Sequence, residues 1–319
     1  MTRDLAGWRL WLPFYVMLAV ACGFADLRMR AHPEHGVQVY VPEVVTGTAE
    51  APGLYRVLAP FTFEWVARLT GADRMIVWHG TRLAWFIIAL LAWHVYLRTW
   101  FCVGSSMLGT AAVAATLPLT YTNSWPHPDS IPELALFAMA CTAIARGKDL
   151  LFAVVLVLAA LNRETAVFLV LLYAVSAPMT RPRLARAAGF GVLWLAVFGG
   201  LRLLRGLKFY DAGQFWRNLE FLTLLPAEYD PYYRAYAWFG LILFGPLIYL
   251  ALASRAAQPM FVRRALWVIP AVVVVAMTMS SIVESRIFLP LYSFVVPGAL
   301  FTLVGPTDIS PDASAGPDR

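Results

Sequence analysis

The sequence predicts an all-α fold, a polytopic bundle of transmembrane helices, and three observations support this prediction. Of 319 residues, 60% are hydrophobic and 14% are charged, whereas soluble domains are about half apolar and a quarter charged. The apolar residues form runs long enough to cross a bilayer. Most basic residues stand at the edges of these runs, as in membrane proteins. The composition therefore excludes an ordinary soluble enzyme and a disordered protein, and the net charge of +6 does not indicate nucleic-acid binding.

Nine apolar runs follow one another along the chain, at 8–25, 75–97, 105–122, 132–145, 150–177, 187–204, 236–253, 266–282 and 288–304. The first run follows two arginines and ends in small residues, as a signal peptide does, but it can also span a bilayer, and we interpret it as an uncleaved helix. Residues 1–304 are therefore predicted to form one integral membrane domain. Residues 305–319, rich in Pro, Asp, Ser and Gly, are predicted to be a disordered cytoplasmic tail.

Two polar connections, 26–74 and 205–235, are long. Neither can lie bare in hydrocarbon, because unpaired backbone groups are costly there. Within the first connection, residues 54–69 are apolar on one side, with Arg56, Glu64 and Arg68 interspersed. This pattern is typical of a helix that lies at the membrane surface. We therefore expect 26–74 to be an external loop that carries an interfacial helix.

The run 150–177 carries Asn162-Arg163-Glu164 near its middle. It could be one tilted helix with a central ion pair, or two half-length helices that meet in a hairpin. In the second case Asn162 caps the second half-helix and Glu164 lies in its first turn, which are positions that these residue types favour. With the hairpin, the chain has about ten membrane segments.

The distribution of basic residues favours the hairpin. Short basic connectors contain Arg98, Arg146, Lys148, Arg181, Arg183, Arg186, Arg255, Arg263 and Arg264. If 150–177 is a hairpin, all of them fall on the side of the N-terminus, whereas a single span would place those after the run on the other face. The positive-inside rule then makes both termini cytoplasmic. Arg28, Arg30, Arg205 and Lys208 are exceptions, because they would lie outside, near helix ends.

Under this topology a set of polar residues shares the outer face. The set contains Asp26, His32, Glu34, His35, Arg56, His79, Arg82, His127, Asp129, Arg163, Glu164, Glu284 and Arg286. An ionised group inside a membrane costs roughly 3 kcal/mol on insertion scales, so such residues normally face a cavity or one another. The second half-helix also points its positive end toward this region. We interpret the set as an anion-binding cavity at the outer surface.

These residues also have a purely structural interpretation. The charged pairs at the hairpin and before the last run could only hold helices together. Ser130 and Glu133 have the spacing of a capping box, with Pro132 in the first turn, so Asp129 could simply belong to a helix start. The histidines match no standard zinc signature and could be solvated. Arg56 could anchor its helix to lipid headgroups.

Short motifs carry a resemblance to a known class of proteins. Residues 47–49 (GTA) followed by 55–61 (YRVLAPF) are similar to a stretch found in uncharacterised bacterial proteins of this class. Residues 161–166 (LNRETA) resemble the basic break in its middle hairpin, and residues 284–286 (ESR) resemble the charged turn before its last helix. With an acidic residue after the first helix and a long surface loop, the chain resembles the GT-C class of membrane glycosyltransferases. The resemblance implies a bacterial inner (plasma) membrane protein that transfers a sugar from a polyprenyl-phosphate donor to a lipid or glycan acceptor on the outer face, with inversion.

The resemblance also implies roles for the polar residues. Asp26 holds the acidic position after the first helix and would be the general base on the acceptor hydroxyl. Arg163, aided by Arg56 or Arg286, would neutralise the leaving phosphate. The other candidate substrate-binding residues are Glu34, His127, Asp129, Glu164 and Glu284.

One departure from the class concerns the acidic position. Members often have two neighbouring acidic residues after the first helix, whereas this chain reads Asp26-Leu27-Arg28. Glu34 is the candidate for the second carboxylate, and the use of a divalent cation stays open. The sequence after 288–304 holds no soluble acceptor-binding domain, so we expect a lipid or glycan acceptor rather than a peptide.

Two other classes of function use the same residues. A transporter or flippase for an anionic lipid-linked substrate needs the arginines but no general base, and its cavity opens to each face in turn. A non-catalytic membrane subunit would use the ion pairs only for packing against a partner. We place the glycosyltransferase ahead of both.

Overall fold

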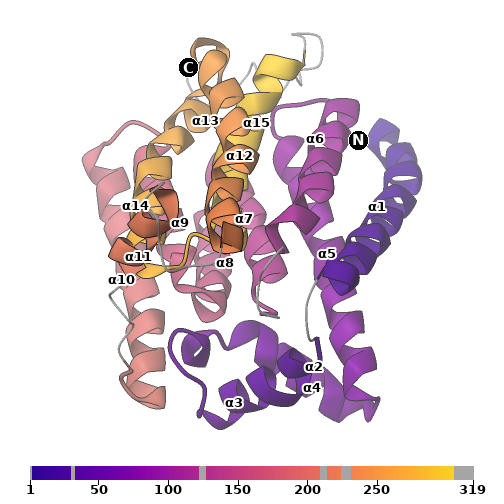
Figure 1. Ribbon diagram of the computed structural model, residues 1–319. Helices are drawn as coiled ribbons and strands as arrows, with labels where there is room; N and C mark the ends of the chain where they lie inside the picture. The colour runs from indigo at the N-terminus through magenta and orange to yellow at the C-terminus, as the bar shows by residue number, and fades with distance from the viewer. Residues whose placement is uncertain (1, 30–32, 122–126, 209–213, 224–230, 305–319) are drawn as a thin grey trace.

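Figure 1 shows the computed structural model as a bundle of helices, with α2 to α4 grouped at one end and the start of α1 and the end of α15 toward the other. The structure describes residues 2–29, 33–121, 127–208, 214–223 and 231–304, and every regular element in these ranges is a helix. The all-α prediction is confirmed for these residues. The predicted tail 305–319 and His32 lie outside them.

The α-helices, in order, are α1 (Thr2–Met29), α2 (Pro33–His35), α3 (Val41–Thr46), α4 (Leu58–Thr70), α5 (Arg74–Leu97), α6 (Val103–Thr116), α7 (Ser130–Ala145), α8 (Asp149–Asn162), α9 (Val167–Val175), α10 (Arg181–Arg205), α11 (Gln214–Leu222), α12 (Pro231–Ala253), α13 (Met260–Ala265), α14 (Ile269–Met279) and α15 (Leu289–Leu303). A π-helical turn covers Gly36–Tyr40, and 3₁₀ turns cover Gly53–Tyr55, Leu117–Tyr121, Glu164–Ala166, Arg255–Ala257, Leu266–Val268 and Ser285–Phe288.

The helix α7 is the centre of the bundle, and almost all of its side chains are buried. It packs against α5, α8 and α15. Small residues such as Ala135, Ala138 and Ala143 allow its neighbours to approach closely, as is common between membrane helices. The buried Tyr96 hydroxyl donates to the Ser293 carbonyl at 2.7 Å and so joins α5 to α15. The candidate site described below lies at the N-terminal end of this central helix.

The break in the run 150–177 is a hairpin, as the basic connectors predicted. The Tyr173 hydroxyl at the end of α9 lies 2.9 Å from Asp149 Oδ1 at the start of α8, and the rings of Tyr173 and Phe152 stack at 5.3 Å. In one continuous helix, residues 149 and 173 would be about 36 Å apart. The prediction that Asn162 caps the second half-helix is wrong: Asn162 ends α8, and its amide donates to the Asp129 carbonyl at 2.8 Å.

The first connection, 26–74, is largely helical. A helix is present within the predicted range 54–69, but it starts later than predicted, because α4 begins at Leu58 and Arg56 lies before it in a non-helical conformation. A tertiary contact explains the difference: the Val57 amide donates to the Leu161 carbonyl at the hairpin tip, at 2.9 Å, instead of entering a helix. Gly71, with φ of 62°, ends α4 in the left-handed conformation that glycine tolerates.

The cations at the end of α10 bind the first connection. Arg205 donates to the Val44 carbonyl, and Lys208 Nζ donates to the Ala49 carbonyl at 2.8 Å. The Tyr55 hydroxyl completes the contact by donating to the Gly206 carbonyl at 2.7 Å. Arg205 and Lys208, two exceptions to the positive-inside pattern, therefore bind backbone carbonyls of the first connection.

Six helical segments of the described residues are long and apolar enough to cross a membrane, and they are Trp11–Arg28, Arg74–Leu97, Val103–Thr120, Arg181–Arg205, Met260–Met279 and Ser285–Leu303. Shorter apolar helices cover Ser130–Ala145, Asp149–Asn162, Glu164–Val175 and Ala237–Ala253. These segments indicate an integral membrane protein. The basic connector between α7 and α8 and the basic start of α10 lie at the same end of the bundle, because Arg186 pairs with Asp149 at 2.9 Å. Arg183, also at the start of α10, donates to Ser176 at 2.7 Å.

Candidate functional site

A network of buried charges occupies the tip of the hairpin, next to the N-terminus of α7. Arg163 is the extended residue between the half-helices, and its Nε lies 3.1 Å from Asp129 Oδ2. Arg56 Nη1 lies 3.2 Å from the same oxygen, and Arg56 Nε lies 3.4 Å from Glu164 Oε2. The network therefore joins three segments that are far apart in the sequence, and all four residues are among the predicted ones.

Glu133 is a member of this network that the sequence analysis assigned to a capping box. Its carboxylate instead accepts hydrogen bonds from the Arg163 guanidinium and the Thr165 hydroxyl. The capping box is not formed, since the helix start at Asp129 has no side-chain capping bond and the Ser130 hydroxyl has no partner among the described residues. The signal that could have identified Glu133 is its place inside the apolar run 132–145, where a charge needs a partner.

The side chain of Asp129 is fully buried. Burial alone would raise the pKa of Asp129, but the guanidinium groups of Arg56 and Arg163 outweigh burial and hold the pKa well below its usual range. An ionised carboxylate here fixes the positions of both arginines. Asp129 is thus suited to orienting the arginines and not to accepting a proton near neutral pH.

His127 lies beside this network of charges. Its Nδ1 lies 3.9 Å from Asp129 Oδ1, and its ring contacts that of Tyr40 edge-on at 4.9 Å. Burial, together with the positive charge of Arg286, holds the pKa of His127 well below its usual range. His127 is therefore neutral near pH 7. The carboxylate of Asp129 opposes this effect without overcoming it.

Arg286 adds a third buried guanidinium beside the network. It binds Glu284 through Nε at 2.9 Å and Nη2 at 2.5 Å. Its Nη1 is buried and has no hydrogen-bond partner among the described residues. An unpaired buried donor is costly, and a ligand oxygen would satisfy it.

Two adjoining cavities meet at these arginines. The polar cavity has a volume of about 250 Å³ and is lined by Arg56, Arg163, Arg286, His127 and Glu284, among others. The apolar cavity has a volume of about 310 Å³, and its wall includes Phe168, Trp194, Phe198, Val272 and Val275. Arg56 and Arg163 line both cavities. A molecule with an anionic group and an apolar chain would fit across the two.

Asp26 lies in a different place. It is buried and paired with Arg82, with Asp26 Oδ2 at 2.7 Å from Nη2 and 2.9 Å from Nε. Asp26, His79 and Arg82 line a third cavity of about 210 Å³. None of the three is among the described residues that line the polar cavity or the apolar cavity. Arg56, Arg163 and Arg286 therefore lie together, as predicted, whereas Asp26 and Arg82 lie apart from them.

Glu34 lies in α2 and is exposed. It is not among the described residues that line the polar cavity or the apolar cavity. Among the residues that the structure describes, no group of three or more His, Cys, Asp or Glu side chains is arranged to hold a metal ion.

Comparisons with known proteins add no relative to this description. No protein-family model, no curated protein and no solved structure matches the chain. The geometry of the site therefore carries the functional argument.

Proposed function

We propose that the protein is a membrane glycosyltransferase-like protein that takes a sugar from a polyprenyl-phosphate donor and transfers it to a lipid or glycan acceptor. The observation that carries this proposal is the junction of the two cavities at Arg56 and Arg163, with Arg286 in the wall of the polar cavity. The apolar cavity suits the first isoprene units of the donor, and the polar cavity suits its phosphate and sugar. Arginine is the residue best suited to phosphate, because its planar fork matches two phosphate oxygens.

In the proposed step the acceptor hydroxyl loses its proton to a carboxylate, and its oxygen bonds to the anomeric carbon of the sugar. The bond from that carbon to the phosphate oxygen breaks, and its electron pair stays on the phosphate. Arg286 Nη1 donates to this developing charge, while Asp129 and Glu133 hold Arg56 and Arg163 in place. Such preorganised donors stabilise the transition state more than the ground state.

Two carboxylates are candidates for the general base. Asp26 is the one that the sequence resemblance implies, and it is paired with Arg82. Glu284 lines the polar cavity itself, with its side chain 21% exposed, so an acceptor bound beside the phosphate would reach it. We keep Asp26 as a prediction and add Glu284 on this geometric ground.

A binding experiment tests the donor site without knowledge of the sugar. Purified protein in nanodiscs is titrated with undecaprenyl phosphate and, in parallel, with undecaprenol. We expect the phosphate to bind at least tenfold more tightly, and Arg286→Gln to remove most of that difference. Arg68→Gln is the matched control, because Arg68 is exposed and lines neither cavity. Equal binding of both lipids by the wild type would overturn the donor site.

A transfer assay tests the chemistry. Proteoliposomes receive a panel of polyprenyl-phosphate monosaccharides and a mixed lipid acceptor, and hydrolysis and transfer of the sugar are followed. The base is the residue, Asp26 or Glu284, whose amide variant loses about 10²–10⁴-fold in rate while undecaprenyl phosphate still binds. Full activity of Asp26→Asn together with Glu284→Gln would sink both assignments. Movement of intact donor across the bilayer without cleavage would establish a transporter instead.

The proposal also includes a topology of about ten membrane segments in a bacterial inner membrane, with both termini and the basic connectors cytoplasmic and the hairpin tip outside. The grouping of Arg183, Arg186 and Asp149 at one end of the bundle supports it. Reporter fusions after Arg186, with fusions after Arg98 and Thr122 as references, test it. A reporter that is active only outside the cytoplasm should be silent after Arg98 and Arg186 and active after Thr122.

A further inference from the structure

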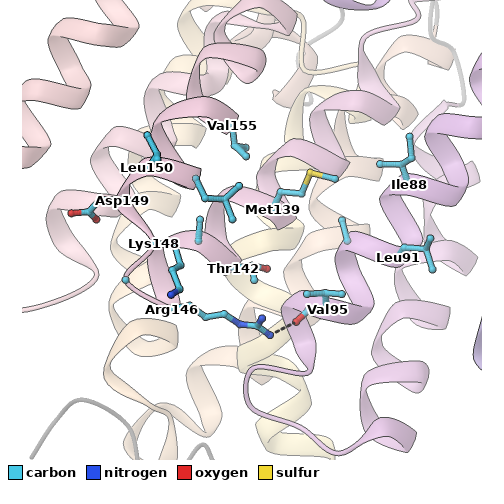
Figure 2. A pocket seen from close by; sticks show the side chains of 14 residues that line it. Ile88, Leu91, Val95, Met139, Thr142, Arg146, Lys148, Asp149, Leu150 and Val155 are labelled. Atoms are coloured by element: carbon cyan, nitrogen blue, oxygen red, sulfur yellow. Dashed lines mark hydrogen bonds between the residues drawn. The ribbon is translucent and has the colours of Figure 1, made fainter. Parts of the chain in front are cut away.

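A large apolar groove lies between α5, α7 and α8, beside the C-terminal half of α7 and thus away from the polar and apolar cavities at Arg56 and Arg163 (Figure 2). Its volume is about 860 Å³, within the range of about 300–1,000 Å³ that is usual for sites of small organic ligands. The wall is almost wholly apolar, with Ile88, Leu91, Met139, Leu151 and Val155 among its residues.

Two cations stand at the mouth of this groove. Arg146 and Lys148 are exposed residues of the short connector between α7 and α8. The connector is a fixed turn, because Gly147 has φ of 63° and the Lys148 amide donates to the Ala143 carbonyl at 2.8 Å. Figure 2 shows Arg146 reaching from α7 toward α5, where its Nη2 donates to the Val95 carbonyl at 3.4 Å. The guanidinium therefore spans the mouth and keeps most of its donors available.

The acidic neighbour of these cations does not neutralise them. Asp149 is also a lining residue of the groove, but its carboxylate points away from the other labelled side chains in Figure 2 and is engaged by Arg186 at 2.9 Å and by the Tyr173 hydroxyl at 2.9 Å. Among the described residues, neither Arg146 nor Lys148 forms an ion pair. The first turn of α8 has no side-chain cap, so its backbone amides add positive potential at the same place. The mouth is thus suited to an anion.

The surface next to the groove is apolar. Leu150, Leu151 and Val154 on α8 are 81%, 51% and 52% exposed. In a chain embedded in a membrane, this face of α8 lies against hydrocarbon. The groove therefore opens sideways to lipid tails, while its charged mouth lies at a helix end, where headgroups are found.

We propose that this groove binds one anionic glycerophospholipid, with its phosphate at Arg146 and Lys148 and an acyl chain along the wall of α5, α7 and α8. Basic pockets between transmembrane helices are a general type of site for anionic headgroups. The combination of two uncompensated cations with an apolar groove of this size distinguishes it from the ordinary annular surface. The inference does not rest on the proposed function at the other end of α8.

A bound lipid would connect α5 to α8 across the groove. The same α8 carries Asn162 and leads into Arg163 at its other end. We therefore expect the lipid to stabilise the hairpin, and anionic lipid should raise the unfolding temperature of the purified protein.

The test compares lipids and charge variants by native mass spectrometry and by thermal unfolding in detergent. Delipidated protein is titrated with dioleoyl phosphatidylglycerol, dioleoyl phosphatidylcholine and glycerol 3-phosphate. The variant is Arg146→Gln with Lys148→Gln. The control is Arg181→Gln with Arg255→Gln, which removes two exposed cations at the same end of the bundle but outside the groove.

We expect one phosphatidylglycerol to bind tightly, with an affinity about 25-fold lower in the groove variant, about fivefold for each cation. The control should bind like the wild type, and the soluble phosphate should neither bind with similar affinity nor shift the unfolding temperature. Equal affinity of wild type and groove variant would overturn the proposal. So would an equal loss in the control, equal binding of phosphatidylcholine, or equal binding of glycerol 3-phosphate.

Discussion

The two ends of the central helix α7 hold charge in opposite ways. At its N-terminal end, the side chains of Asp129, Glu133 and Arg163 are at most 4% exposed and each contacts another charge. At its C-terminal end, Arg146 and Lys148 are exposed and form no ion pair among the described residues. Buried pairs cost desolvation energy that only complete partnering offsets, whereas exposed charges contribute little to stability. The comparison teaches that the first end holds its arginines in fixed positions through buried carboxylates, whereas the second end leaves its cations without an ionic partner among the described residues.

The largest expected effect is at the carboxylate that two arginines share. Asp129→Asn leaves Arg56 and Arg163 without their common charge in a buried setting, and we expect a loss of about 3–5 kcal/mol in the free energy of unfolding. Unfolding by SDS in mixed micelles measures it. Glu64→Gln is the control, because its partner Arg68 is 72% exposed and the loss there should stay below about 1 kcal/mol. Similar losses in the two variants would remove the distinction between buried and exposed charge.

A smaller effect is expected at Glu133. Glu133→Gln keeps the size of the side chain and a bond to the Thr165 hydroxyl, but the Arg163 guanidinium loses one of its two negative partners. We expect the unfolding free energy to fall by about 1–3 kcal/mol, which is less than for Asp129→Asn. If Glu133 were only the distant half of a capping box, the loss would be about 1 kcal/mol or less, and Ser130→Ala would reproduce it.

The hairpin and the meeting of Arg56, Asp129 and Arg163 could be predicted because they depend on features that the sequence displays. Hydropathy marks the segments, and the side on which basic connectors fall decides whether a run crosses once or turns back. The start of α4 and the role of Asn162 could not be predicted in this way. Both depend on backbone carbonyls of distant segments. The Leu161 carbonyl accepts from the Val57 amide, which local propensity would place in a helix, and the Asp129 carbonyl accepts from the Asn162 side chain, which local propensity would place at a cap.

The partners of the acidic residues were the least predictable part of the candidate site. Glu133 had a local explanation, a capping box with Ser130 three residues before it. Its partner in the structure is Arg163, which lies 30 residues away. Asp26 was grouped with the arginines of the hairpin tip because all share the outer face, but its partner is Arg82 on the neighbouring helix. Sequence patterns assign charged residues to an end of the bundle, and packing in three dimensions assigns them to one another.

A third prediction concerns the hydrogen bond that joins the two half-helices. Tyr173→Phe removes the donor to Asp149 but keeps the ring stacked on Phe152. We expect a loss of about 0.5–1 kcal/mol in SDS unfolding, since hydrogen bonds between membrane helices contribute about that much. Tyr249→Phe is the matched control, because Tyr249 is 73% exposed and its loss should be near zero. Equal losses would show that the bond across the hairpin contributes nothing.

The smallest expected effect is a pH dependence at the surface helix α4, where the Arg68 side chain donates to Glu64 at 2.9 Å. This hydrogen bond, opposed by burial and supported by Arg74, lowers the pKa of Glu64 from its ordinary value of 4.5. A carboxyl group whose pKa is lower in the folded state contributes stability above its unfolded pKa and loses it as the pH falls through the folded value. The wild type should therefore be more stable than Glu64→Gln by less than about 1 kcal/mol at pH 7, and the difference should shrink as the pH falls below 4.5 and vanish once the pH is well below the pKa of the folded-state carboxyl group. A difference that was undiminished at pH 3 would have to come from the shape of the side chain and not from its charge.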